Sequence, residues 1–202
     1  PRGAISWRAV GWFAVSMLCK TSGVMLPAAL LLLALWQHGR VRRADWIAAA
    51  PLFGVSLLLG LVTIWFQFDR SIGTTEIPIG GVAARLALAG STLAFYAGKT
   101  LWPLPLLPIY PRWPVDPPAV WLFLPWLVIA ALAVWAWRNR TGWPRHLLLG
   151  LGWFALHLAP FLGLLTISYM RFTWTMDHMA YVALLGPIGL AAAALGVALR
   201  SS

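Results

Sequence analysis

Hydrophobic residues occur along this chain in six long runs, and most charged residues lie in the connections between them. A helix that crosses a bilayer needs about 20 apolar residues, and each run is of roughly that class. The pattern predicts six membrane-spanning helices. Their expected ranges are residues 4–19, 22–36, 46–66, 120–137, 146–167 and 179–199.

The boundary between the first two runs is the polar segment that begins at Lys20. A single helix through both runs would be about 48 Å long, too long for a bilayer core of ~30 Å. We therefore expect a break at Lys20. Tryptophans near the ends of runs indicate the headgroup level, where indole rings are favoured. These are Trp36, Trp46, Trp65, Trp121, Trp137 and Trp174.

Residues 80–118 have a different pattern. Arg85 and Lys99 flank a moderately apolar, helix-like stretch, and residues 102–111 then contain four prolines. Prolines at this density cannot sustain a helical hydrogen-bond ladder, and irregular backbone at membrane depth must be shielded by protein or line a wet cavity. We expect an amphipathic or re-entrant element followed by an extended loop, with both ends on one side of the membrane.

Composition agrees with a membrane protein, since 61% of the residues are hydrophobic and 10% are charged. We expect one all-α, polytopic transmembrane domain over residues 1–202. Because the chain enters apolar sequence directly after Pro1, we interpret it as a fragment of a longer membrane protein. Cys19 is the only cysteine and no two histidines have ligand spacing, so we predict no protein-bound metal in this fragment.

The net charge of +10 has an uneven distribution. The arginines cluster between apolar runs and do not interleave with aromatics on a polar face, which argues against nucleic-acid binding. The positive-inside rule places the basic connections 39–43 and 138–145 in the cytoplasm, together with Arg2, Arg8 and Arg200. The cytoplasmic side then has nine cations and one acid, and the outer side has six cations and four acids.

The six outer cations occur in four separate segments that a helical bundle could bring together. Converging cations suit an anionic headgroup, because Arg forms bidentate contacts with a phosphate and Lys supplies a point charge. For any single cation, snorkelling at a helix end is the alternative. The outer cations are Lys20, Arg70, Arg85, Lys99, Arg112 and Arg171, and we predict a lipid-phosphate site formed by Lys20, Lys99, Arg112 and Arg171.

Three motifs resemble those of a known family. Residues 18–36, with a basic loop after them, are similar to its "SK-x-x-x-x-x-LP-LLLL-D-x-W" stretch. Residues 95–111 resemble "Y-x-x-K-x-x-W-P-x-x-L-x-x-x-Y-P", and residues 177–186 resemble "D-R/H-x-x-Y-L-P/A-x-x-G". The family comprises multispanning bacterial glycosyltransferase-type proteins, many with tetratricopeptide repeats, related to transmembrane O-mannosyltransferases. The three motifs occur in the family's order and together cover roughly residues 15–190.

The resemblance implies a GT-C membrane fold that transfers a sugar from a polyprenyl-phosphate donor to a protein or glycan acceptor. It also implies the inner membrane of a bacterium, with the functional loops on the periplasmic side. In the family the acidic catalytic motif precedes the part seen here, and no tetratricopeptide pattern is visible in this chain. No cofactor is expected in the fragment, although a divalent metal is possible in the full-length enzyme.

Sugar transfer requires a base for the acceptor and cations for the departing phosphate. Asp177 and His178 are the candidate catalytic residues, and Tyr110 and Tyr181 are expected to line the same cavity. His178 and Tyr181 are interpreted as sharing a helix face with Asp177. For Asp177, a helix N-cap with an ion pair is favoured over direct catalysis. His157, in mid-span, is expected to hydrogen-bond between helices.

Two other functions remain open on the sequence. A transporter or flippase half for lipid-linked sugars would also use outer cations and broken helices. Inverted repeats, or ionisable residues at mid-bilayer depth, would favour it, and the sequence places only His157 at such depth. A non-catalytic membrane scaffold is the third possibility.

Overall fold

The computed structural model describes residues 5–74 and 76–201, and every regular element in these residues is helical. This confirms the all-α fold class. Arg2, which was assigned to the cytoplasmic side, and residue 4, the start of the first predicted run, lie outside the described residues. The α-helices are α1 (Trp7–Cys19), α2 (Leu26–His38), α3 (Arg43–Phe66), α4 (Val82–Leu101), α5 (Leu124–Arg138), α6 (Pro144–Leu158) and α7 (Leu185–Ser201).

Shorter elements connect or extend these helices. A π-helix, Gln67–Ile72, continues α3 directly. Several 3₁₀ helices occupy the connections between the α-helices, as is usual for this tighter helix in short pieces. They are η1 (Thr21–Gly23), η3 (Val120–Phe123), η4 (Ala159–Phe161), η5 (Ser168–Arg171) and η6 (Asp177–Ala180).

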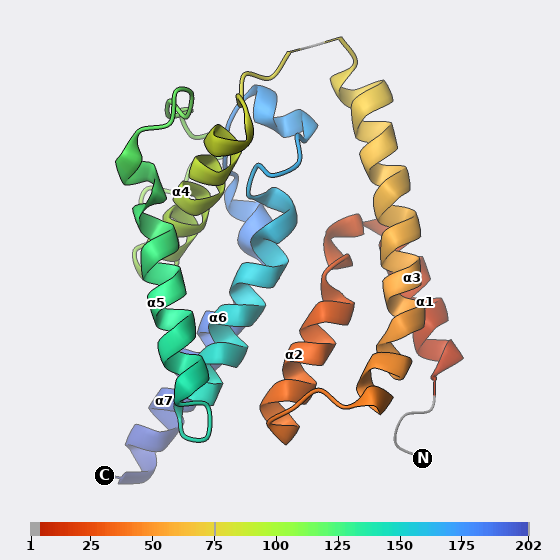
Figure 1. Cartoon of the computed structure of the whole chain (residues 1–202), viewed down its shortest axis with the longest axis vertical. Coiled ribbons are helices and arrows are strands. Elements are labelled where there is room, and N and C mark those ends of the chain that lie inside the picture. Colours follow the sequence, from red (N-terminus) through yellow and green to blue (C-terminus); the bar gives the residue numbers. More distant parts are fainter. Residues whose placement is uncertain (1–4, 75, 202) are drawn as a thin grey trace.

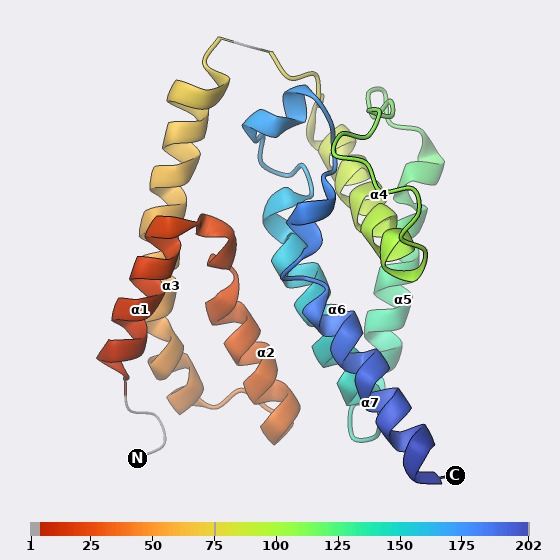
Figure 2. The same cartoon turned by 180° about the vertical axis from the view of Figure 1, so that it is seen from behind.

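The helices form two groups, α1 to α3 and α4 to α7, which meet through α2 and α6 (Figures 1 and 2). The Trp36 indole donates a hydrogen bond to His146 Nδ1 over 3.1 Å across this contact. A Cβ at Gly152 would lie 2.8 Å from Leu32, so the glycine is what allows the two helices to approach so closely. The largest buried cluster lies in the second group and includes Tyr96, Phe154 and Leu158.

The arginine-rich connections gather at one end of the molecule. The α2–α3 connection, the α5–α6 connection and the end of α7 lie together at the bottom of Figure 1. We call this the basic end. The α3–α4 connection and the helices η4 and η5 lie at the opposite, far end (Figure 1). This is the arrangement that the charge pattern predicts for the two sides of a membrane.

Three segments of the described chain are long and apolar enough to cross a bilayer: Thr21–His38, Arg43–Ile72 and Val120–Arg138. They indicate a membrane protein. A bundle of about six spans is not confirmed, because α1, α6 and α7 have only 13, 15 and 17 residues. The fifth predicted run extends to Ile167, but α6 ends at Leu158. Pro160 lacks the amide that would continue the ladder, and Gly163 adopts a φ of +89°.

The break predicted at Lys20 is confirmed, since α1 ends at Cys19 and η1 follows. The placement of Lys20 on the outer side stays a prediction, although the α1–α2 hairpin stops short of the far end of α3 (Figure 1). Val24, at the tip of the α1–α2 hairpin, lies beside Gly60, where an added Cβ would be 3.6 Å away. The helical segment of α3 continues from Gly60 to Ile72, roughly 15 to 18 Å farther. The hairpin therefore turns beside the middle of the continuous helical segment that α3 and the π-helix form (Figure 1).

Residues 80–118 leave the far end and return to it. Helix α4 descends from that end to mid-height, and the proline-rich segment leads back to the start of α5 (Figures 1 and 2). A Cβ at Gly80 would lie 2.6 Å from Asp116 Oδ2, so the two ends of the excursion are adjacent. The Trp126 indole donates to the Leu86 carbonyl over 2.8 Å and holds α5 against α4. The predicted helix and the loop after it are present and their ends are adjacent, while the side of the membrane on which they lie stays a prediction.

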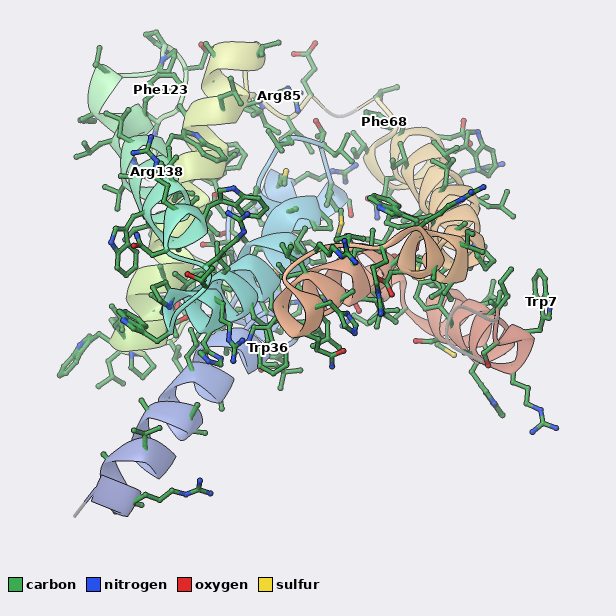
Figure 3. The ribbon with its side chains drawn as sticks, turned by 60° about the horizontal axis from the view of Figure 1, so that its bottom comes forward. Trp7, Trp36, Phe68, Arg85, Phe123 and Arg138 are labelled. Carbon is green, nitrogen blue, oxygen red and sulfur yellow. The ribbon has the colours of Figure 1, made fainter. Side chains whose placement is uncertain are left out.

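The tryptophans divide into two kinds. Trp46, Trp65, Trp121 and Trp137 are all about half exposed, as expected for side chains at a bilayer interface. Trp7 also points away from the other helices (Figure 3). The interface assignment of Trp174 is wrong, because Trp174 is 3% exposed and its indole donates to the Trp113 carbonyl over 2.8 Å. Its role is to pack the far end.

Candidate functional site

Tyr110 and Asp177 meet within the second helix group, beside the last turn of α4. The Tyr110 hydroxyl lies 2.9 and 3.0 Å from the two carboxylate oxygens of Asp177 and donates to them. Tyr110 belongs to the proline-rich segment and Asp177 begins η6, so the contact joins regions 67 residues apart. Two of the three motifs that carry the family resemblance are therefore in direct contact.

The surrounding segments fix Tyr110 firmly. Its side chain is 6% exposed, and its backbone N–H donates to Thr173 Oγ1 over 3.3 Å. The Thr173 hydroxyl in turn donates to the Thr175 carbonyl over 2.8 Å. The Phe95 ring from α4 packs edge-on against the Tyr110 ring, with centroids 4.8 Å apart. Contacts from three segments thus place one phenol oxygen against one carboxylate.

Lys99 lies on the other face of the same tyrosine. Its ammonium nitrogen is 5.2 Å from the centre of the Tyr110 ring and donates a hydrogen bond to the Pro105 carbonyl. Lys99 occupies the last turn of α4, where the helix dipole favours a cation. Within the described residues neither Lys99 nor Asp177 has an ion-pair partner within 4.0 Å. The site therefore contains a cation and a carboxylate, and Tyr110 touches both.

Burial raises the pKa of the Tyr110 phenol, and the hydrogen bond to Asp177 raises it further. Both effects favour the protonated form, because the ionised phenolate would be desolvated and would face a carboxylate. Tyr110 is therefore a hydrogen-bond donor throughout the physiological pH range, and Asp177 is the acceptor.

The N-cap and ion-pair interpretation of Asp177 is wrong. Met176 occupies the N-cap position of η6, and that cap has no side-chain hydrogen bond. Asp177 is the first residue of a 3₁₀ helix, and its carboxylate faces Tyr110. Its hydrogen bond is therefore to a side chain distant in sequence and not to the backbone of its own helix.

His178 and Tyr181 do not join this cluster. Both are exposed, Tyr181 to 68%. The reason is the helix period, since a 3₁₀ helix has three residues per turn. Asp177 shares a face with Ala180, which is buried, whereas His178 shares a face with Tyr181. The prediction that all three residues point into one cavity required α-helical spacing, which the structure does not have here.

Arg171 holds two segments together. Its Nη2 donates to the Ser71 and Ile72 carbonyls, both over 2.6 Å, and thereby attaches η5 to the end of the α3 segment. Its Nε is buried without a hydrogen-bond partner. Arg171 is therefore engaged with backbone, and only part of its guanidinium remains for an anion.

The other predicted phosphate ligands are not all brought together. The Arg112 guanidinium lies 5.3 Å from the Trp174 ring and is exposed at the far end. Arg85 donates to Thr166 Oγ1 over 3.1 Å and approaches two carbonyls, so it supports the connection after α6. Lys20 is at mid-height on the other helix group. Lys99 is the predicted ligand that lies closest to the Tyr110–Asp177 contact.

Tyr96 is a residue of the site that the sequence predictions missed. It is 1% exposed, and its hydroxyl donates to the Met176 carbonyl over 2.9 Å and accepts from the Met176 N–H over 3.0 Å. Tyr96 thereby holds the backbone directly before Asp177. The available signal was its position in the second motif, three residues before Lys99 and so on the same face of α4.

His157 also differs from its prediction. Its ring Nδ1 is 3.0 Å from the Trp153 carbonyl, one turn earlier in the same helix, so this hydrogen bond is not between helices. In the part of the chain that the structure describes, no three His, Cys, Asp or Glu side chains form a group that could hold a metal ion. A cavity of about 440 Å³ lies at the basic end, away from Asp177.

Comparison of the chain with protein-family models, with curated proteins and with solved structures returns no match.

Proposed function

We propose that this chain is a membrane-embedded part of a GT-C-type glycosyltransferase that uses a polyprenyl-phosphate sugar donor. The observation that supports the proposal is the convergence of Lys99, Tyr110 and Asp177 beside the last turn of α4, away from the arginine clusters of the basic end. These three residues belong to two of the three motifs that resemble the family, and they supply a cation and a carboxylate at one place.

In the proposed reaction the bond between the sugar and the donor phosphate breaks, and the phosphate leaves with the electron pair. Lys99 stabilises the charge that develops on that phosphate. The acceptor hydroxyl attacks the sugar carbon and transfers its proton to Asp177. Tyr110 orients the carboxylate, and Tyr96 holds the backbone before it.

The test is sugar transfer from a labelled polyprenyl-phosphate sugar in membranes that contain the protein as its gene encodes it. Lys99→Ala should weaken donor use strongly, and Lys99→Arg should recover part of it. Asp177→Asn should lower the maximal rate and leave donor binding nearly unchanged. Arg70→Ala is the matched control, since Arg70 is an exposed cation at the far end that pairs with Asp69 over 2.9 Å. Normal transfer by both Lys99→Ala and Asp177→Asn would refute the proposal.

A second candidate is a transporter or flippase half for lipid-linked sugars, and Lys20 favours it. An ionisable residue at membrane depth is costly and marks a functional site by default. Lys20 is exposed on the hairpin tip at mid-height of α3. In proteoliposomes, this function predicts movement of a polyprenyl-phosphate sugar between leaflets without sugar transfer, and loss of that movement in Lys20→Met.

A further inference from the structure

The basic end contains a cavity that the proposed transfer reaction does not use. It has a volume of about 440 Å³ and lies between α2, the α5–α6 connection and the first turns of α6. Figure 3 looks onto this end, where Trp36 and Arg138 are labelled. The cavity has two kinds of wall. One is polar, with His38, Arg140, Thr141 and Arg145, and the other is apolar, with Leu32, Leu35, Leu148 and Leu149.

The polar wall has uncompensated positive charge. Arg140 donates to the Trp137 carbonyl over 3.0 Å and stacks 4.4 Å from that ring, which leaves its remaining N–H groups free for an anion. Within the described residues, neither Arg140 nor Arg145 forms an ion pair. His38 Nδ1 is 3.1 Å from the Ala34 carbonyl, so the ring is held in place at the rim.

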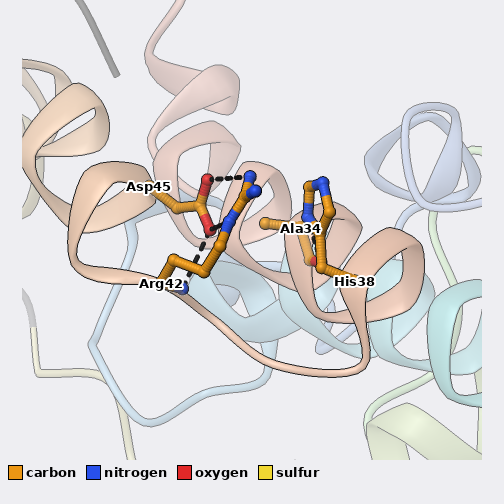
Figure 4. Close-up of polar contacts among 4 residues, drawn as sticks. All are labelled: Ala34, His38, Arg42 and Asp45. Carbon is orange, nitrogen blue, oxygen red and sulfur yellow. Dashed lines mark hydrogen bonds and ion pairs between the residues drawn. The ribbon is translucent and has the colours of Figure 1, made fainter. Parts of the chain in front are cut away.

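The acid at the basic end does not neutralise these arginines. Asp45 is bound by Arg42 through both carboxylate oxygens, each over 3.1 Å, and by the Arg42 backbone N–H over 2.9 Å (Figure 4). This capping box closes the start of α3 and satisfies Asp45 locally. A bound anion beside Arg140 and Arg145 would therefore meet a positive field with little opposition.

The depth of the cavity matches a lipid headgroup. It lies where α2 ends, at the boundary of the candidate span Thr21–His38. Trp137 and Trp143 flank the α5–α6 connection and are 47% and 64% exposed, as expected for indole rings at headgroup level. The Trp36 hydrogen bond to His146 fixes the wall between the polar and apolar parts.

We propose that this cavity binds an anionic phospholipid, with the headgroup phosphate on Arg140 and Arg145 and an acyl chain along Leu32, Leu35 and Leu148. Basic pockets between helices at the cytoplasmic side suit anionic headgroups. The leucine wall fits an acyl chain better than a purely polar ligand, and the arginine wall fits an anionic headgroup better than a neutral one.

The experiment measures phosphatidylglycerol and phosphatidylcholine retained by the full protein in native mass spectrometry, after exchange into nanodiscs of each lipid. The wild type should retain phosphatidylglycerol preferentially. Arg140→Gln with Arg145→Gln should weaken retention about 25-fold, or about fivefold for each arginine. Arg138→Gln is the matched control in the same connection, because Arg138 does not line the cavity, and it should change retention less than twofold.

A second variant keeps the charge and fills the space. Thr141→Trp should displace phosphatidylglycerol although both arginines remain, since Thr141 is exposed and lines the cavity. Unchanged thermal unfolding in phosphatidylcholine nanodiscs shows that the variants are folded. The proposal is overturned if Arg138→Gln weakens retention as much as the double variant, or if Thr141→Trp retains the lipid normally. It also fails if inorganic phosphate alone stabilises the protein as much as phosphatidylglycerol does, because the ligand is then a free anion.

Discussion

Tyr110 donates to Asp177 across a separation of 67 residues, with its hydroxyl 2.9 and 3.0 Å from the two carboxylate oxygens. The contact pins the proline-rich segment to the start of η6. It also accounts for the orientation of Asp177, which an isolated 3₁₀ turn would leave free.

The first prediction concerns the pKa of Tyr110, which burial and Asp177 raise above the ordinary value of 10.0. Asp177→Asn should lower this pKa because the negative charge is removed, yet leave it above 10.0 because burial is the larger cause. The measurement is the ultraviolet absorbance of the phenolate, taken as the difference from Tyr110→Phe. Asp116→Asn is the control, an exposed acid near the far end, and should leave the titration unchanged. A pKa that stays constant in Asp177→Asn would show that the hydrogen bond is absent in solution.

The same hydrogen bond predicts how stability depends on pH. Tyr110→Phe should lower the free energy of unfolding by about 2 kcal/mol at neutral pH, since a bond to a charged acceptor is lost. The folded-state pKa is raised, so this stabilisation is complete below pH 10.0 and is lost as the pH rises through the folded value. Wild type and variant should therefore converge at high pH in denaturant unfolding. A difference that grew with pH would have the wrong sign.

The packing of α6 against α7 depends on a close approach of their backbones. A Cβ at Gly186 would collide with the Gly150 carbonyl, whereas a Cβ at Gly189 meets nothing within 4 Å. Gly186→Ala should therefore destabilise the protein by about 1–3 kcal/mol through overpacking. Gly189→Ala, on the same helix, should be neutral or stabilise by up to about 1 kcal/mol. Thermal unfolding in detergent compares the two, and equal effects would argue against the close contact.

Arg171 is expected to act mainly on structure. Arg171→Ala should cost about 2 kcal/mol, because two charge-assisted hydrogen bonds to Ser71 and Ile72 are lost. It should also speed proteolysis between residues 73 and 80. Arg70→Ala removes an exposed ion pair and should cost less than about 1 kcal/mol. If Arg171→Ala instead abolishes donor binding at unchanged stability, then its role as a phosphate ligand is correct.

Side-specific labelling tests the orientation. In a Cys19→Ser background, Glu76→Cys should react with an impermeant thiol reagent added outside the cell, since Glu76 is exposed at the far end. Thr141→Cys, exposed at the basic end, should react only after the membrane is permeabilised. The reverse pattern would invert the topology, and labelling of both from outside would place the chain off the membrane.

Patterns that depend on the local backbone were predicted correctly from the sequence. The break at Lys20, the helix before the proline-rich segment and the shared end of the arginine connections follow from helix length, proline chemistry and charge. Helix lengths were predicted less well. Apolar composition continues past Leu158, but Pro160 and Gly163 end α6, so hydropathy alone overestimates the span.

The candidate site was predicted only in part, because its key contacts are long-range. Asp177 was identified, but its partner Tyr110 was expected only as a cavity wall, and Tyr96 was not assigned a role. The spacing of residues 177–181 gave the wrong shared face, since the period there is three and not 3.6. The position of Lys20 depends on how far the α1–α2 hairpin extends along α3, which no local pattern encodes.

The adjacency of Gly80 and Asp116 also bears on how many times the chain crosses the membrane. If residues 81–115 do not cross the membrane, α5 starts on the side from which α4 starts, whatever the length of this stretch. On that condition, residues 81–115 are an insertion that does not change the number of membrane crossings. Its core-facing residues are nevertheless constrained, because Tyr96 of α4 packs in the largest buried cluster and the Leu86 carbonyl accepts from Trp126 of α5.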